Sequence, residues 1–397
     1  MTEPIGSPHP RTISIQPRPR SPSQLIDMMI AIKDFDGVDW GAKDSRGDKI
    51  TQIIVGEAIG QSQSFKIVPK SEKTMQYRTY VTMNPPTLGL AYIDDNQKLR
   101  ITKAGLQAAH EKDLEMLFTR QLIKWQYPSN SHGGSGGKGA NSFPLRDKWK
   151  YHPFVSIIMI CIRLGELTGN TDACYLSKEE VAIFITTMYT DKQVNEISDE
   201  LLSLRNKCVT KKANEKKILR RKKHLEKLNE VYRDDIDKGL FKIRQRMTNS
   251  IDEFLETKID NTNDYADTII RYCRFTGIFR YSERVKNLAF NPHQKWKAEL
   301  IASTPDFLKI NSDIDNKENF YDWFGDTNTP KLPWESEIGY KKEILENLKQ
   351  SLKHLNLVCQ TEFELMSLTK NEYDSYVEEL KKITHSMSDE ISVKIIL

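Results

Sequence analysis

Two widely separated segments of the chain follow the same plan, in which a short β-hairpin lies beside helical stretches. The first is LGLAYIDDNQKLRITKAGLQAAH, residues 88–110. An apolar strand over 90–93 precedes the polar residues Asp94, Asp95 and Asn96. A return strand follows over 99–102, and a helix rich in small residues begins directly after it. Polar turn residues between two short apolar runs predict a hairpin at this place.

The second segment is DYADTIIRYCRFTGIFRYSERVKNLAFNP, residues 264–292. Its pattern predicts a helix, a strand GIFRY, a charged turn SERVKN, and a strand LAF that Asn291 and Pro292 close. A hairpin directly after helices is the layout of a winged helix, a variant of the helix-turn-helix. The predicted fold class is therefore mainly α with short β-hairpins (α+β), with two winged-helix-like DNA-binding subdomains followed by a helical linker. The alternative is two unrelated hairpins, since hairpins after helices are common.

Capping residues locate several helix starts. Ser21 precedes Pro22, which suits the first helical position, and Gln24 falls where a capping box needs it. The same spacing recurs in two further pairs, Ser177 with Glu180 and Thr190 with Gln193. The region between the two hairpins is therefore expected to be almost wholly helical.

The length of 397 residues exceeds what one core usually supports, so we expect several domains. The predicted parts are a disordered tail over 1–20, a first recognition subdomain over 21–150, a second over 151–292 with an inserted basic helix, and a helical linker or docking region over 293–397. The last region contains an apolar stripe at helical spacing, formed by Ile344, Leu348, Leu352 and Leu355.

Nothing in the sequence points to a membrane or a secreted protein. The apolar run PFVSIIMICIRLGEL is too short for a membrane span and contains Arg163, so it predicts a core helix. The proline-rich N-terminus lacks the apolar region of a secretion signal. Five cysteines stand far apart, which suits free thiols in a reducing cytosol better than disulfides or a zinc site. We therefore expect a cytoplasmic protein.

Charge is unevenly distributed along the chain. Residues 1–299 contain 48 Lys and Arg against 37 Asp and Glu, whereas residues 300–397 contain 11 against 18. The densest cationic stretch is 205–227, and six or more cations on one of its faces would release counterions from DNA without specifying sequence. The alternative is a solvated helix face that touches nothing. The candidate residues of this run are Lys211, Lys212, Lys216, Lys217, Arg220, Arg221, Lys222 and Lys223.

Candidate base-reading residues lie beside the hairpins. In TIIRYCRFTGIFR the apolar residues can face the core while Arg271, Arg274 and Arg280 project elsewhere. The groove-reading helix of a winged helix lies here, and arginine suits a two-point contact with guanine. In the first unit, Arg100 and Lys103 are the corresponding candidates for reading bases. For each of them the alternative is a phosphate contact or an ordinary surface cation.

The string RQLIKWQYPSN, residues 120–130, ends a helix that we expect to begin near Asp113. The apolar stripe of this helix ends on Trp125, which we interpret as a core anchor rather than a platform for stacking bases. Arg120, Lys124 and Gln126 lie off that stripe, so we expect their side chains to be available for phosphates.

Two motifs that invite a catalytic or phosphate-binding interpretation fail on spacing. The glycine-rich run over 132–142 has His132 and Gly139 where a phosphate loop needs Gly and Ser or Thr, so it predicts a flexible loop. Asp306, Asp315 and Lys317 stand in the order of a magnesium-dependent PD-(D/E)xK nuclease. That chemistry needs carboxylates on adjacent apolar strands, which these residues do not predict. The site stays a minor alternative to a solvent loop, and the chain's own residues indicate a DNA-binding protein without an evident active site.

Several strings of the chain occur together in a familiar order. They are PRSPSQL, LRITKAG, RQLIKWQYPS, VNEISDELLSLRN, RYCRFTGIF, LAFNP and WFGDTNTPKLPW. Over residues 19–340 their order resembles that of the AlwI family of type IIS restriction endonucleases and their nicking relatives.

The resemblance implies two winged-helix-like subdomains that recognise a short asymmetric site in double-stranded DNA, then a helical linker and a magnesium-dependent PD-(D/E)xK nuclease domain that cuts outside the site. We expect that nuclease domain to be missing from this chain. Cleavage and its magnesium ion would then belong to a further domain or a separate nuclease subunit, with no cofactor held here. The alternative function is a winged-helix regulator or replication initiator that binds DNA and never cuts it.

Overall fold

The structure is a computed structural model that describes residues 12–13, 15, 21–62, 64–65, 80–130, 149–239, 241–243, 246–336 and 378. Within these ranges the chain is mostly helical with small antiparallel sheets, which confirms the predicted class of a mainly α chain with short hairpins. The glycine-rich run over 132–142, the apolar stripe over 344–355 and Cys359 lie outside the described residues.

The first unit contains the predicted hairpin. Its helices and strands are α1 (Pro22–Ile32), α2 (Ile50–Gly60), a helical stretch over 80–87, β1 (Ala91–Ile93), β2 (Leu99–Ile101), α4 (Lys103–Ala109) and α5 (Leu114–Lys124), with the 3₁₀ turn η1 (Lys33–Phe35) after α1. Tyr92 pairs with Arg100 across the hairpin. The outer edge of β2 is covered, because the amides of Gly37 and Trp40 donate to the carbonyls of Leu99 and Gln97, both at 2.7 Å.

Local sequence accounts for the turn of this hairpin. The completely buried carboxylate of Asp94 accepts from the amide of Lys98 and from Nε of Arg100, both at 2.7 Å. Thr102 then caps α4 by accepting from the amide of Gly105 at 3.1 Å. At the start of α1, Ser21 occupies the N-cap position, but its side chain makes no capping hydrogen bond. The predicted capping box with Gln24 is therefore wrong.

The second unit surrounds a three-stranded sheet. Its helices and strands are α6 (Pro153–Thr168), β3 (Tyr175–Ser177), α7 (Lys178–Glu180), α8 (Val194–Val209), α9 (Ala213–Val231), α10 (Arg233–Asp237), β4 (Lys242–Ile243), β5 (Arg246–Met247), α11 (Ile251–Phe275), β6 (Phe279–Ser282) and β7 (Asn287–Phe290). The 3₁₀ turns η3 (Thr171–Ala173) and η5 (Asp191–Gln193) join them, and the short π-helix η4 (Val181–Ile185) continues α7. The sheet order is β3-β7-β6, so the strand before α7 pairs with the last strand of the hairpin.

The capping boxes predicted in the second unit are confirmed. The hydroxyl of Ser177 accepts from the amide of Glu180, and the Glu180 carboxylate accepts from the amide of Ser177 at 2.8 Å. Thr190 and Gln193 form the second box ahead of α8. The predicted core helix is α6, which is buried along most of its length.

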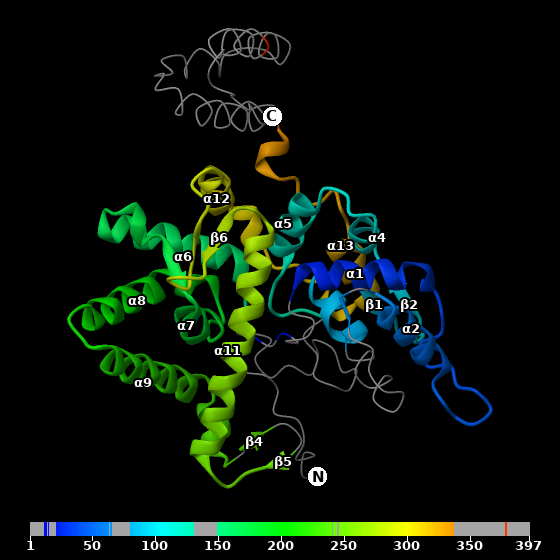
Figure 1. The fold of residues 1–397 in the computed structure, drawn as a ribbon, viewed down its shortest axis with the longest axis horizontal. Coiled ribbons are helices and arrows are strands. Elements are labelled where there is room, and N and C mark those ends of the chain that lie inside the picture. The colour runs from blue at the N-terminus through cyan, green and yellow to red at the C-terminus, as the bar shows by residue number, and fades with distance from the viewer. Residues whose placement is uncertain are drawn as a thin grey trace.

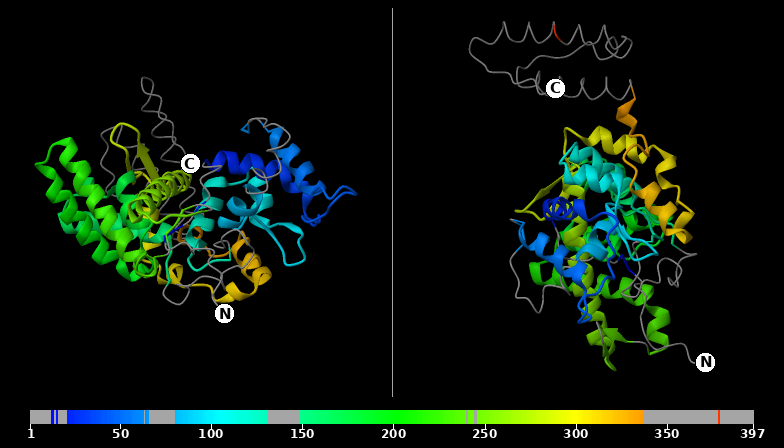
Figure 2. Two further views of the ribbon diagram at one scale, coloured as in Figure 1. Left: turned by 90° about the horizontal axis from the view of Figure 1, so that it is seen from below. Right: turned by 90° about the vertical axis from the view of Figure 1, so that its right-hand side faces the viewer.

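The chain after the second hairpin returns to the first unit. It forms α12 (Lys295–Ala302), η6 (Pro305–Leu308), η7 (Asp313–Asp315), α13 (Lys317–Phe324) and η8 (Pro333–Glu335). Helix α12 packs against α6, whereas α13 lies beside the first hairpin, where Tyr321 stacks on Tyr92 with ring centroids 4.3 Å apart. In Figure 1, α11 runs between the α8 and α9 side and the side with α1, α2 and α4. Figure 2 shows the orange end of this segment against the first unit.

One hydrophobic core joins these parts. The same cluster of buried side chains includes Leu25, Ile158, Ile270 and Trp334, and so reaches from the first unit through the second to η8. A smaller cluster around Phe254 packs the C-terminal end of α9 against the N-terminal end of α11. The boundaries predicted between the subdomains stay a prediction.

Three further expectations concern the chain as a whole. Within the predicted tail over 1–20, Ile13 and Ile15 are buried in the main core, so the chain packs against the protein at these two positions. Among the described helices, none is long and apolar enough to cross a membrane. The four cysteines in the described ranges are free and buried.

Candidate nucleic-acid interface

The cationic run from residue 205 ends α8 and fills most of α9. Helix α9 packs against α8 and α11, so one of its faces is buried. At that face His224 and Thr262 Oγ1 are hydrogen-bonded at 2.9 Å, and burial lowers the pKa of His224 to about 4. The imidazole is therefore neutral at physiological pH, and its hydrogen bond joins α9 to α11. Cations of α9 border two different pockets, since Lys222 and Lys223 line one and Lys216 and Arg220 line another.

Carboxylates already hold half of the candidate cations of this run. Arg220 pairs with Glu179 at 2.5 Å and Arg221 pairs with Glu256. Lys223 pairs with Glu200 at 3.0 Å, and Lys211 lies 3.9 Å from Glu215. The other four have no ion-pair partner in the described part of the chain; they are Lys212, Lys216, Lys217 and Lys222. A face of six or more unpaired cations therefore does not form.

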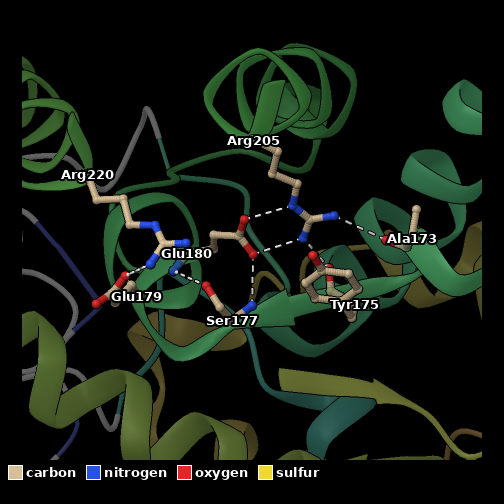
Figure 3. A network of polar contacts seen from close by, with 7 residues as sticks. All are labelled: Ala173, Tyr175, Ser177, Glu179, Glu180, Arg205 and Arg220. Atoms are coloured by element: carbon tan, nitrogen blue, oxygen red, sulfur yellow. Dashed lines mark hydrogen bonds and ion pairs between the residues drawn. The ribbon is translucent and has the colours of Figure 1, made fainter. Parts of the chain in front are cut away.

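Arg205, at the start of the run, is a structural residue. Figure 3 shows its guanidinium against Glu180, Tyr175 and Ala173. The guanidinium donates to both Glu180 oxygens, at 2.7 and 2.8 Å, and to the carbonyls of Tyr175 at 2.6 Å and Ala173 at 3.2 Å. It also lies over the Tyr175 ring, 4.1 Å from the centroid. This buried pair fixes the end of β3 and the start of α7 to α8.

An open pocket of about 590 Å³ lies beside this network. Its walls come from β3 and α7, from the end of α8, from α9, and from the turn between β6 and β7. Four of its cations come from three different elements; they are Lys178, Lys216, Arg220 and Lys286. The sequence predicted the charged turn SERVKN, but nothing in it placed Lys286 in one pocket with residues of α9.

The end of α11 presents the candidate base-reading arginines. Ile269, Ile270 and Cys273 are buried, as predicted from the spacing. The side chains of Arg271 and Arg274 are 44% and 43% exposed.

Neighbouring carboxylates orient these two arginines. Arg271 Nε lies 2.9 Å from Asp267, which also binds Lys178 at 3.3 Å. Arg274 lies 3.8 Å from Glu283 and over the Tyr281 ring. Arg280 is exposed on β6, so the three arginines share the region where α11 meets the hairpin.

The candidates of the first unit have other contacts. Arg100 holds the buried Asp94 at 2.7 Å and so closes its own hairpin turn. Lys103 is 75% exposed and lies 3.7 Å from Asp326. Of Arg100 and Lys103, only Lys103 keeps its charged group mostly exposed.

The expectation that Arg120, Lys124 and Gln126 are available for phosphates is wrong, because all three side chains are buried. Arg120 donates to the carbonyl of Pro330 at 3.1 Å and to Glu335 at 2.5 Å. Gln126 exchanges two hydrogen bonds with the backbone of Asn311, at 3.0 and 2.8 Å. The returning segment covers this face of α5, so the polar side of the helix is an internal surface.

Trp125 is a core anchor, as predicted, with 1% of its surface exposed. Its ring meets Tyr127 edge-on, and Tyr127 meets Trp149 in the same way. This aromatic group fills the core at the end of α5.

The residues of the PD-(D/E)xK order do not lie on strands. Asp306 belongs to the 3₁₀ turn η6 and pairs with Lys309 at the surface at 2.7 Å. Asp315 lies in η7, and Lys317 begins α13 and pairs with Asp95 at 2.7 Å. In the described ranges, no three His, Cys, Asp or Glu side chains lie where they could hold a metal ion together. These residues therefore do not fit a magnesium site.

Comparison with known proteins places the chain in a sequence family. The family model described as AlwI restriction endonuclease matches residues 86–394. A search of curated proteins finds no match. Among solved structures, the BpuJ1 endonuclease binding domain, in a crystal structure with pyrene- and phenanthrene-modified DNA, is similar over 76% of this chain and 91% of that chain. The two share 12% sequence identity with a TM-score of 0.46.

Proposed function

The chain belongs to the AlwI restriction endonuclease family, and on this basis we propose that it recognises a short asymmetric site in double-stranded DNA as the recognition part of a type IIS restriction or nicking endonuclease. The observation that carries the proposal is a shared order of elements in the two units.

In the second unit the order is helix, strand, helix, helix and hairpin, and the first strand pairs with the last. This is the order of a winged helix, with α8, α9 and the β4–β5 hairpin inserted before α11. The first unit repeats it: residues 37–40 follow α1 and pair with residues 97–99 beside the β1–β2 hairpin. The same pairing in both units supports two winged-helix-like subdomains.

In this arrangement the last turns of α11 read the major groove. Arg271 and Arg274 are the base-reading candidates, because their side chains are partly exposed there. Asp267 pre-orients Arg271, and the O6 and N7 atoms of a guanine would compete with that carboxylate for the guanidinium. Cations around the β6–β7 turn and on α9 would contact phosphates and supply affinity without sequence preference.

Phosphodiester hydrolysis is proposed to take place outside the described residues. Asp306, Asp315 and Lys317 do not form the paired-strand site that the chemistry needs. A nuclease domain or a separate nuclease subunit would supply the step, with magnesium as its cofactor. The protein is also proposed to be cytoplasmic, because a DNA substrate and free cysteines both suit that reducing compartment.

The experiment that tests recognition is selection from a pool of randomised DNA duplexes by the purified chain. Enrichment of one short asymmetric sequence is expected, and a bound fraction that stays random would reject the proposal.

Cleavage is tested with supercoiled plasmid and magnesium, with the chain alone and with cell extract. Nicking by the chain alone that is lost in Asp306→Ala but kept in Asp313→Ala would overturn our assignment of cleavage to other residues.

A further inference from the structure

We propose that the open pocket between β3, α9 and the β6–β7 turn holds a phosphate of the DNA backbone, and that Glu179 weakens this contact by competing for Arg220. The inference rests on the proposed DNA binding and names the residues that carry it. Neither the family nor the order of elements assigns a function to this pocket.

The charges of the pocket favour an anion. Lys216 from α9 and Lys286 from the β6–β7 turn line it, and neither ammonium has an ion-pair partner among the residues that the structure describes. Lys178 and Arg220 add two further cations, each held by one carboxylate. Because these cations come from α7, α9 and the β6–β7 turn, an anion in the pocket could be contacted by more than one element.

The two carboxylates of the pocket differ in their exposure and in the number of hydrogen bonds that they accept. Glu180 accepts from Arg205 with both oxygens and from the amide of Ser177, and it is 95% buried, so its charge is already compensated. Glu179 is 53% exposed, and within the described ranges its one ion-pair partner is Arg220, which is 37% exposed. Figure 3 shows the two pairs side by side, with Arg220 reaching Glu179 at the edge of the network. Only the Glu179 pair can exchange for a phosphate without unfolding the wall.

Two exposed valines indicate a sugar-phosphate chain rather than a small polar metabolite. Val209 and Val285 line the pocket and are 70% and 58% exposed. A deoxyribose beside the bound phosphate would cover part of this apolar surface. The pocket also lies next to the proposed reading helix, since Asp267 binds both Lys178 of the pocket and Arg271 of α11.

The first test compares neighbouring lysines on α9. Affinity for the selected duplex is measured by fluorescence anisotropy at several salt concentrations, with full-length wild type, Lys216→Gln and Lys217→Gln. Lys216→Gln is expected to weaken binding about fivefold to tenfold near 0.1 M salt and to reduce the salt slope by about 1. Lys217 carries the same charge one residue away but does not line the pocket, so its replacement is expected to have a smaller effect.

The second test uses a variant that is expected to strengthen DNA binding rather than weaken it. Glu179→Gln frees Arg220 and is expected to tighten binding several-fold. Glu166→Gln is the matched control, because it removes the same charge and frees Arg163, which lies on α6 outside the pocket and is not a DNA-binding candidate. Thermal melts followed by circular dichroism check that all four variants fold.

The outcomes separate the inference from the proposed function. Equal effects of the two lysine variants, or of the two glutamate variants, would overturn the phosphate pocket while sequence-specific binding stands. Calorimetric binding of inorganic phosphate that Lys216→Gln abolishes, with unchanged DNA affinity, would assign the pocket to a small anion and also overturn it. Wild type that binds no duplex would reject the proposed function itself.

Discussion

The ammonium group of Lys124 donates a hydrogen bond of 2.6 Å to the carbonyl oxygen of Asp326, although only 3% of this lysine is exposed. A second bond of 3.2 Å reaches the carbonyl of Trp323. Lys124 thus fastens the segment around α13 to α5, and burial lowers its pKa to about 7.

This lysine predicts a pH dependence of stability. Between pH 7 and about 10 the unfolded chain binds a proton at Lys124 that the folded chain has lost, so the free energy of unfolding rises with pH. Relative to Lys124→Met, wild type is expected to gain up to about 1.4 kcal/mol for each pH unit in this window. Urea unfolding at several pH values measures the difference. Parallel curves for wild type and variant would show that Lys124 does not titrate there.

Gly105 predicts a packing defect on substitution. A Cβ at this position would lie 2.0 Å from the carbonyl oxygen of Leu90 and 2.9 Å from Cε of Met29. Since the clash is with backbone, Gly105→Ala is expected to destabilise the protein by about 1–3 kcal/mol or more. The control Lys103→Ala changes a 75% exposed side chain on the same helix and should stay within about 0.5 kcal/mol. Equal denaturation midpoints for the two variants would contradict the close contact between α4 and the hairpin.

The Glu180–Arg205 pair predicts a strong effect of one-sided replacement. Glu180→Gln leaves the Arg205 guanidinium without its counter-charge in a buried site and is expected to cost about 3 kcal/mol. Glu166→Gln is the control, because it breaks the exposed pair with Arg163 and should cost less than about 1 kcal/mol. Chemical denaturation measures both. The double variant Glu180→Gln with Arg205→Met should recover part of the loss, and no recovery would argue against a direct pair.

The two groups of arginines are predicted to act differently on DNA. Arg271→Ala or Arg274→Ala is expected to relax the preference at one base pair, because these side chains lie on the proposed reading helix. Replacement of Arg220 and Arg221 by Ala is expected to weaken binding to every sequence and to flatten the salt slope, because phosphates carry no sequence information. Site selection and salt titration with each variant give the two readouts. If both groups of variants lost the same affinity for every sequence, the division into base-reading and phosphate-binding arginines would be rejected.

Local patterns in the sequence determined much of the secondary structure. The polar turn after Ile93 and the charged turn before Asn287 predicted both hairpins, and the structure places them there. The box of Ser177 with Glu180 was readable because a capping box involves residues only three positions apart. The buried stripe of α11 followed in the same way from helical spacing, which left Arg271 and Arg274 on the open side.

Tertiary structure alone decided which polar residues are available to a partner. Arg120, Lys124 and Gln126 lie off the apolar stripe of their helix, yet residues about 200 positions later cover them and accept their hydrogen bonds. Helical spacing tells which side of a helix is polar, but not whether backbone from elsewhere in the chain satisfies that side. The same holds for Glu179 and Lys286, because the pocket that they share exists only where elements far apart in the sequence meet.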